Sequence, residues 1–211
     1  MNIIIITQDE PFFLSENIEF LLKNLPDYAQ VKLCIVTEVS PFGKEKSFFK
    51  KSIDTLSIFG LNFFVRYSFK YIIAKLNPKT GVIPVLNAHG VPVHILNCSV
   101  NSKLILQEIE SHSPDLIISI AGNQIFCKPL IQLPKKGIIN LHTADLPQYR
   151  GLFPTFWALK HGEEKLGVSV FFVDEGIDSG PILVQRHLKI RERNLEKLIR
   201  ESKRIGMECI L

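Results

Sequence analysis

The fold class is decided by residues 1–37, which read MNIIIITQDEPFFLSENIEFLLKNLPDYAQVKLCIVT. Residues 1–7 contain the unbroken apolar run Ile3 to Ile6, of the kind found in a strand that is covered on both faces. Residues 15–25 then place apolar side chains at helical spacing, and residues 31–37 form a second apolar strand. This order of strand, loop, helix and strand is typical of the start of a parallel sheet, so we predict an α/β fold.

Elements of the same kind follow along the chain. We predict strands at 89–96, 115–121, 137–142, 168–173 and 181–190, helices at 102–111 and 156–161, and a terminal helix from Asn194. The strands at 168–173 and 181–190 are predicted to form a hairpin. Because the sequence has no internal repeat, low-complexity segment or linker, we predict a single domain over residues 1–211.

Composition narrows the class of protein. The chain is 46% hydrophobic and 22% charged, which excludes a disordered or collagen-like chain. Its formal net charge of +4 suits an anionic small substrate and is weak evidence for nucleic acid binding. Cys34, Cys98, Cys127 and Cys209 include no CxxC pair, and the N-terminus lacks the features of a signal peptide. We therefore expect a cytoplasmic protein without a disulfide framework or a zinc knuckle.

Residues 43–77 are unusually rich in Phe, Tyr and Lys. We predict one or two amphipathic helices here, broken near Gly60. The longest uncharged stretch, Thr55 to Val65, is about half of the ~20 residues that a membrane span requires, so no transmembrane span is expected. Packing on the sheet is the simplest role for this segment. A homodimer face, an acceptor-binding element and a membrane-surface helix remain as alternatives.

Polar side chains gather where the predicted strands end, which is where open α/β sheets bind ligands. Asn140 and His142 are two positions apart on one strand, so they project to the same side. The loop at 173–181 contains three acidic residues, two glycines and a proline, and one of the acids could contact a histidine. A third loop, at 121–126, has a glycine that would let a ligand approach the backbone.

An asparagine, a histidine and an aspartate can together catalyse acyl transfer to an external nucleophile. The histidine accepts a proton from an attacking amine, and the asparagine amide donates to the oxygen that becomes negative. The aspartate orients the histidine. No protein nucleophile is needed, and the sequence contains no GxSxG motif.

These residues resemble the motifs of the folate-dependent formyltransferases. That family includes the methionyl-tRNA formyltransferase catalytic domain, glycinamide ribonucleotide transformylase and the nucleotide-sugar N-formyltransferases. The matching segments are N140-L-H-T-A-D-L-P147, Y149-R-G151 and D174-E-G-I-D-S-G180. The resemblance is dense over about 115–187, looser over 1–40 and absent over 43–80. It implies a Rossmann-like, mostly parallel sheet with flanking helices, 10-formyltetrahydrofolate as the formyl donor, and no metal.

The resemblance also implies roles for individual residues. It makes Asn140, His142 and Asp178 the catalytic residues. It implies that two loops hold the pterin of the donor, largely through backbone groups: Gly122, Asn123, Gln124 and Ile125 in the first, and Val173, Asp174, Glu175, Gly176 and Ile177 in the second. On the acceptor side, Asp145 is expected to contact the amine and Arg150 a phosphate or carboxylate, beside Gly151.

We therefore predict transfer of a formyl group from 10-formyltetrahydrofolate to an amine of a small-molecule acceptor. An amino sugar nucleotide is the favoured acceptor, followed by the amine of a peptide or amino acid. No segment matches the C-terminal β-barrel with which methionyl-tRNA formyltransferases help to bind tRNA, so neither that domain nor a nucleic acid partner is expected. Two alternatives remain: hydrolysis of 10-formyltetrahydrofolate, and a non-catalytic protein that binds folate or another ligand.

Overall fold

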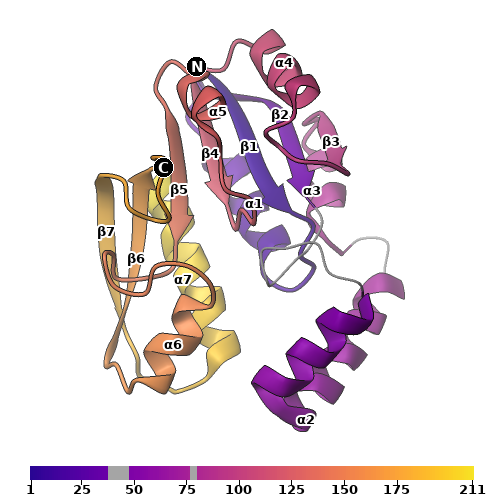
Figure 1. Cartoon of the computed structure of the whole chain (residues 1–211), viewed down its shortest axis with the longest axis vertical. Helices are drawn as coiled ribbons and strands as arrows, with labels where there is room; N and C mark the ends of the chain where they lie inside the picture. The colour runs from indigo at the N-terminus through magenta and orange to yellow at the C-terminus, as the bar shows by residue number, and fades with distance from the viewer. Residues whose placement is uncertain (38–47, 77–79) are drawn as a thin grey trace.

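The computed structural model describes residues 1–37, 48–76 and 80–211. Within this part of the chain, seven strands form one sheet in the order β3-β2-β1-β4-β5-β6-β7 (Figure 1). The strands are β1 (Asn2–Gln8), β2 (Gln30–Thr37), β3 (Val93–Leu96), β4 (Leu116–Ile120), β5 (Ile138–His142), β6 (Lys165–Phe172) and β7 (Ile182–Lys189). The strands β3, β2, β1, β4 and β5 pair in parallel, whereas the pairings of β5 with β6 and of β6 with β7 are antiparallel. The predicted mostly parallel α/β sheet is confirmed.

Helices cover both faces of the sheet. They are α1 (Leu14–Asn24), α2 (Phe48–Leu76), α3 (Val82–Ala88), α4 (Lys103–Ser111), α5 (Lys128–Gln132), α6 (Pro154–Lys160) and α7 (Leu195–Ile210). Alternate residues of β1 enter two separate cores, because Ile3 and Ile5 pack with α1, α3 and α7 while Ile4 and Ile6 pack with α4 and α5. Burial on both faces explains why β1 is a continuous apolar run.

Helix α7 packs closely against the strand that carries two predicted catalytic residues. Gly206 of α7 is buried, and a methyl group added there would overlap the side chain of Leu141 on β5. Leu141 lies between Asn140 and His142, with its side chain in the core that α7 covers. The absence of a side chain at Gly206 therefore sets how closely α7 approaches β5.

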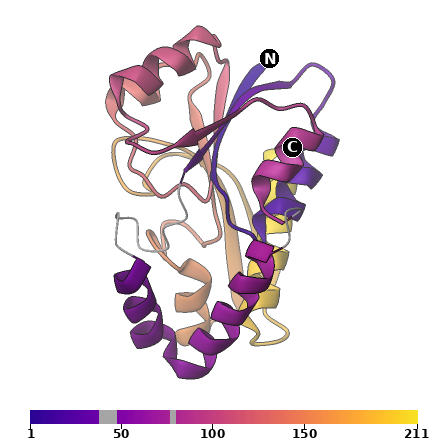
Figure 2. The same ribbon diagram turned by 90° about the vertical axis from the view of Figure 1, so that its right-hand side faces the viewer.

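Helix α2 contains the break expected near Gly60. The backbone at Gly60 has φ 79° and ψ 171°, which is non-helical and divides α2 into two segments. Figure 2 shows these segments meeting in a V whose bend points away from the sheet. Residues 43–47 and 77 of the predicted segment lie outside the described residues. No helix in the described ranges is long and apolar enough to cross a bilayer.

Two short helices were not predicted. Helix α3 follows the turn at Gly81 and contains Pro84, and α5 carries Pro129 at its start. Both helices are too short to show a helical spacing of apolar residues, and their glycine and proline residues indicated turns instead. Strand β3 is also shorter than the predicted 89–96, since it begins at Val93, after Pro92.

Candidate active site

Strand β5 brings two of the predicted catalytic residues to the carboxyl edge of the parallel strands. In the sheet, Asn140 is opposite Ser119 of β4 and Phe171 of β6. Asn140 is half-buried and His142 is only 9% exposed. As residues i and i+2 of one strand, they project to the same face of the sheet.

The imidazole of His142 is held by two acceptors. Its Nε2 lies 2.9 Å from the backbone carbonyl oxygen of Tyr149 and 3.5 Å from Oδ2 of Asp178. A ring nitrogen that faces two oxygen acceptors carries the proton, which we therefore assign to Nε2 in the neutral ring. The structure thus brings Asp178 to His142, although the two residues lie in different loops.

Asp178 is itself tied to a second loop. Its Oδ2 accepts a hydrogen bond of 2.8 Å from the backbone N–H of Gly151. Gly151 follows Tyr149 in the loop after β5, and Asp178 lies in the loop between β6 and β7. One carboxylate therefore lies beside the imidazole and joins the loop after β5 to the loop after β6.

Backbone conformation at this edge of the sheet is unusual. Five residues other than glycine have left-handed φ angles within the described part of the chain, and Ala121, Tyr149, Phe153 and Asp178 are four of them. All four lie in the loops after β4, β5 or β6. Left-handed backbone costs free energy for residues with a Cβ, and such conformations cluster at functional sites. The observation supports a functional role for these loops.

Tyr149 was not predicted as a site residue. Its carbonyl oxygen meets His142, and its hydroxyl donates a 2.6 Å hydrogen bond to Oε1 of Glu163. This hydrogen bond, together with burial and the Glu163 charge, raises the pKa of Tyr149 from its ordinary value of 10.0 to about 12. The segment Y149-R-G151 did draw attention to this loop, but its side chains suggested contact with the acceptor.

The two loops predicted to hold the donor approach each other. Lys128, at the start of α5, forms a 3.4 Å ion pair with Glu175 of the loop after β6. Both loops carry an exposed apolar side chain, Ile125 in one and Ile177 in the other. These two isoleucines provide exposed apolar surface of the kind that ligand sites use.

Other predicted donor-binding side chains serve the loops themselves. The Asp174 carboxylate accepts hydrogen bonds from the Gly176 N–H at 3.0 Å and the Ser179 hydroxyl at 2.7 Å. The Gln124 side-chain oxygen accepts from the Val100 N–H at 2.8 Å. Among the remaining predicted positions, Gly122 is exposed, Asn123 is half-buried, and Val173 donates its N–H to Ile138 of β5 at 2.8 Å.

The predicted acceptor-side residues differ in their partners. Asp145 lies 2.9 Å from Nε2 of His187 on β7, and Arg150 is exposed. The Gly151 N–H is used by Asp178. Gly151 therefore holds the loop that contains Asp178, and its predicted place beside the acceptor stays a prediction.

Acidic residues in the loop after β1 occupy the N-termini of two helices. The Glu10 carboxylate accepts from the N–H groups of Phe12, Phe13 and Leu14, at 2.6, 3.0 and 3.2 Å, where α1 begins. Burial raises the pKa of Glu10, although the charge of Lys203 and these hydrogen bonds oppose the shift. Asp9 accepts from the Val82 N–H at 2.7 Å, where α3 begins. Helix N-termini favour anions, and here the chain supplies its own.

A sequence model of the family described as Formyl transferase matches residues 77–206. The chain belongs to the formyl transferase family. The matched region contains every predicted site residue, including Asn140, His142 and Asp178. Helix α2 lies outside it.

Several curated relatives of this member of the formyl transferase family are methionyl-tRNA formyltransferases. One from Thermodesulfovibrio yellowstonii is 40% identical over 107 residues, which cover 50% of this chain and 35% of the relative. Another, from Trichlorobacter lovleyi, is 34% identical over 123 residues, which cover 58% of this chain and 39% of the relative. The matches thus span less than half the length of these relatives.

Solved structures share the formyl transferase fold at low sequence identity. A phosphoribosylglycinamide formyltransferase from Anaplasma phagocytophilum has a TM-score of 0.71 at 16% identity, covering 100% of this chain and 83% of that one. A sugar N-formyltransferase from a Shewanella species has a TM-score of 0.62 at 19% identity, covering 100% of this chain and 66% of that one. These similarities establish the fold, in agreement with the sheet order described above.

Proposed function

We propose that this chain transfers a formyl group from 10-formyltetrahydrofolate to an amine, with Asn140, His142 and Asp178 as catalytic residues. The observation that carries the proposal is the Asp178 carboxylate, 3.5 Å from His142 and hydrogen-bonded to Gly151, at the carboxyl end of β5. Membership of the formyl transferase family supports the same reaction class.

The reaction needs proton transfer and stabilisation of negative charge, both of which these residues can supply. The amine attacks the formyl carbon, a new carbon–nitrogen bond forms, and the bond to the folate nitrogen breaks. His142 takes the proton that the amine loses, directly or through water, and the folate nitrogen gains one. The Asn140 amide donates to the formyl oxygen while it is negative. Asp178 positions the imidazole and any bridging water.

The donor would lie between the loops at 122–125 and 173–177. Ile125 and Ile177 would contact the pterin, and the Lys128–Glu175 ion pair would hold the two loops together. Backbone groups would provide the remaining recognition, since the Asp174 and Gln124 side chains already have partners within the protein.

We propose a small-molecule amine as the acceptor, with an amino sugar nucleotide favoured. The named relatives and neighbours act on methionyl-tRNA, phosphoribosylglycinamide or a sugar, so each remains a candidate for this chain. Glu10 occupies the N–H groups at the start of α1, which argues against an acceptor whose phosphate must bind there. An acceptor that enters beside Asp145 and Arg150 would be unaffected by the Glu10 carboxylate.

We propose the cytoplasm as the site of the reaction, because the four cysteines are free.

The first experiment is calorimetric titration of the full chain with 5-formyltetrahydrofolate, a stable analogue of the donor. We expect micromolar binding that is weakened by Ile177→Asp. Incubation with 10-formyltetrahydrofolate and an amine panel then identifies the acceptor; the panel includes an amino sugar nucleotide, phosphoribosylglycinamide and methionyl-tRNA. His142→Ala should abolish transfer, whereas the control His89→Ala, at an exposed histidine on the C-terminal end of α3, should retain it.

Each alternative has its own result in this experiment. Formate release without any amine would identify a hydrolase, and donor binding with no turnover on any amine would identify a binding protein. A folded sample that shows no detectable donor binding would overturn the folate-dependent proposal.

A further inference from the structure

The second segment of α2 exposes an apolar face. Leu61, Val65, Phe69, Ile72 and Leu76 are each between 55% and 79% exposed. Their spacing of three or four residues places them on one side of the helix, and we call them the outer stripe. With about 1.5 Å of rise per residue, this stripe extends over roughly 22 Å. Scattered apolar residues are normal on a protein surface, but a continuous stripe of this length indicates an interaction site.

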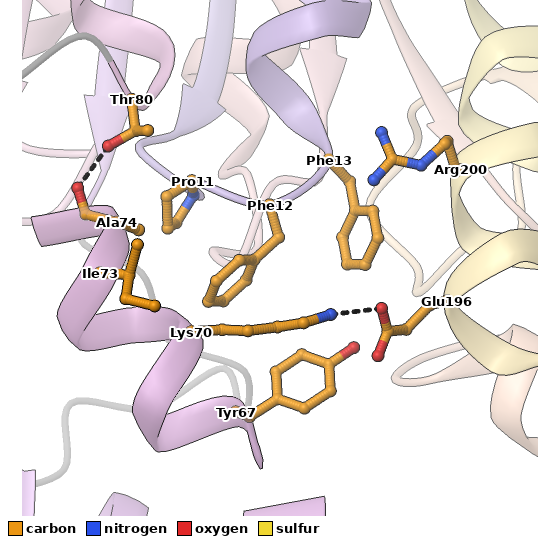
Figure 3. A pocket seen from close by; sticks show the side chains of 10 residues that line it. All are labelled: Pro11, Phe12, Phe13, Tyr67, Lys70, Ile73, Ala74, Thr80, Glu196 and Arg200. Atoms are coloured by element: carbon orange, nitrogen blue, oxygen red, sulfur yellow. Dashed lines mark hydrogen bonds and ion pairs between the residues drawn. The ribbon is translucent and has the colours of Figure 1, made fainter. Parts of the chain in front are cut away.

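The opposite face of the same segment is packed against the protein. Figure 3 shows Tyr67 and Lys70 directed toward Phe12 and Glu196, where they line a cavity of about 270 Å³. The rings of Tyr67 and Phe12 meet edge to face with centroids 5.6 Å apart, and Nζ of Lys70 lies 2.5 Å from Oε2 of Glu196. The segment is therefore anchored by one face, and the outer stripe is the face that remains exposed.

Charge is concentrated on the same element. Residues 48–76 contain five of the 25 lysines and arginines and one of the 21 acidic residues. This one helical element thus accounts for the whole formal charge of +4, and the rest of the chain is neutral in sum. Helices with an apolar face and an excess of lysine and arginine bind in the plane of anionic membranes. Two copies of this element placed face to face would instead bring like charges together.

The position of α2 relates this face to the candidate active site. Figure 1 places α2 beyond the carboxyl ends of the parallel strands, the edge at which β5 presents His142. A surface that binds α2 would therefore contact the end of the molecule at which the parallel strands end. Because α2 is outside the residues that the family model matches, this function would be separate from the shared chemistry.

We propose that the outer stripe of α2, together with the exposed cations Lys50 and Arg66, binds the surface of an anionic membrane. The helix lies in the interface without crossing it, with Phe69 and the flanking leucines among the lipid chains and Arg66 and Lys50 at the level of the headgroups. Arg66 and Lys50 both have exposed side chains, and the Arg66 guanidinium also forms a 3.1 Å ion pair with Glu196 of α7 along one edge. This arrangement delivers the active-site edge of the sheet to the membrane surface.

Co-sedimentation of the full chain with vesicles tests the proposal independently of formyl transfer. We expect binding to vesicles of phosphatidylcholine mixed with phosphatidylglycerol and at least tenfold weaker binding to phosphatidylcholine alone. Phe69→Glu should weaken binding at least tenfold, because it places a charge among the lipid chains. Arg66→Gln should weaken it about fivefold, the effect of roughly one juxtamembrane cation. Salt at about 1 M should release the protein, since the screening length falls to about 3 Å.

A matched control is available on another helix. Leu104 of α4 is 71% exposed, against 66% for Phe69, so Leu104→Glu adds the same charge at a similar exposure. It should leave vesicle binding unchanged. Leu61→Gln provides a milder second variant if Phe69→Glu lowers the melting temperature, and it should still weaken binding several-fold.

Three results would overturn the proposal. The first is a folded wild-type chain that fails to sediment with anionic vesicles, and the second is equal binding to neutral and anionic vesicles. The third is a Phe69→Glu variant that converts a dimer to a monomer while its vesicle binding equals that of the wild type, which would assign the outer stripe to a second copy of this chain.

Discussion

The Asp178 carboxylate and the Gly151 backbone N–H are joined by a hydrogen bond of 2.8 Å. This bond connects the loop between β6 and β7 to the loop after β5, and the same carboxylate oxygen lies 3.5 Å from His142. The charge of Asp178 therefore acts on the imidazole from a fixed position, because a backbone N–H restricts where the carboxylate can move.

Asp178→Asn separates the charge of this residue from its structural bond. The asparagine oxygen can still accept from Gly151, and asparagine tolerates the left-handed φ of 47°, so stability should change by less than about 0.5 kcal/mol. Loss of the charge beside His142 should lower kcat about 10²–10⁴-fold. Steady-state kinetics and thermal melts measure both quantities. Asp115→Asn, in which the changed carboxylate lies near the start of β4, is the control and should retain full activity. A near-normal kcat for Asp178→Asn would remove Asp178 from the catalytic set.

Gly206→Ala tests whether α7 positions the catalytic strand. The added methyl group overlaps Leu141, so the helix or the strand must move, and we expect a loss of about 1–3 kcal/mol in the free energy of unfolding. Because Leu141 lies between Asn140 and His142, kcat should fall as well. Denaturant unfolding and kinetics check both effects. Glu208→Ala, at an exposed position on the same helix, should change neither by much, since its ion pair with Arg186 is exposed.

Tyr149→Phe removes the hydrogen bond to Glu163 and should cost about 1 kcal/mol near neutral pH. The folded pKa of Tyr149, about 12, is above its ordinary value of 10.0, so the unfolded chain loses this proton first. The contribution of the bond is therefore complete below pH 10.0 and lost as the pH rises through about 12. Melting temperatures of the two proteins should differ below pH 10.0 and converge above it. A difference that does not depend on pH would contradict this account.

Ala121→Gly should stabilise the protein by about 0.5–1 kcal/mol. The left-handed φ of 55° at Ala121 is unfavourable for a residue with a Cβ, and glycine adopts it without that cost. Ala158→Gly is the control of opposite sign: Ala158 is buried inside α6, so the same change should destabilise there by about 1–2 kcal/mol through helix propensity and the lost buried methyl group. Thermal melts measure whether each substitution raises or lowers the melting temperature. Destabilisation by both substitutions would show that the Ala121 methyl contributes packing that outweighs the backbone cost.

The central sheet could be predicted from the sequence, because strands buried on two faces leave long apolar runs such as residues 1–7. The projection of Asn140 and His142 to the same face of the sheet could be predicted from the two-residue period of a strand. Asp178 was found only through its motif, since no local pattern indicates which of three loop acids reaches a histidine. The contacts of the Tyr149 carbonyl and the Gly151 N–H could not be predicted at all. Every residue carries a carbonyl group and nearly every residue an N–H, so only the folded loops reveal which of these groups are used.

Helix α7 contacts α2 near its N-terminal end and strand β5 near its C-terminal end. Near its first turn, Glu196 receives Lys70 and Arg66 of α2, at 2.5 and 3.1 Å. About 15 Å further along α7, Gly206 packs against Leu141 of β5. Helix α7 therefore connects α2, through the ion pairs of Glu196, to the strand that carries Asn140 and His142.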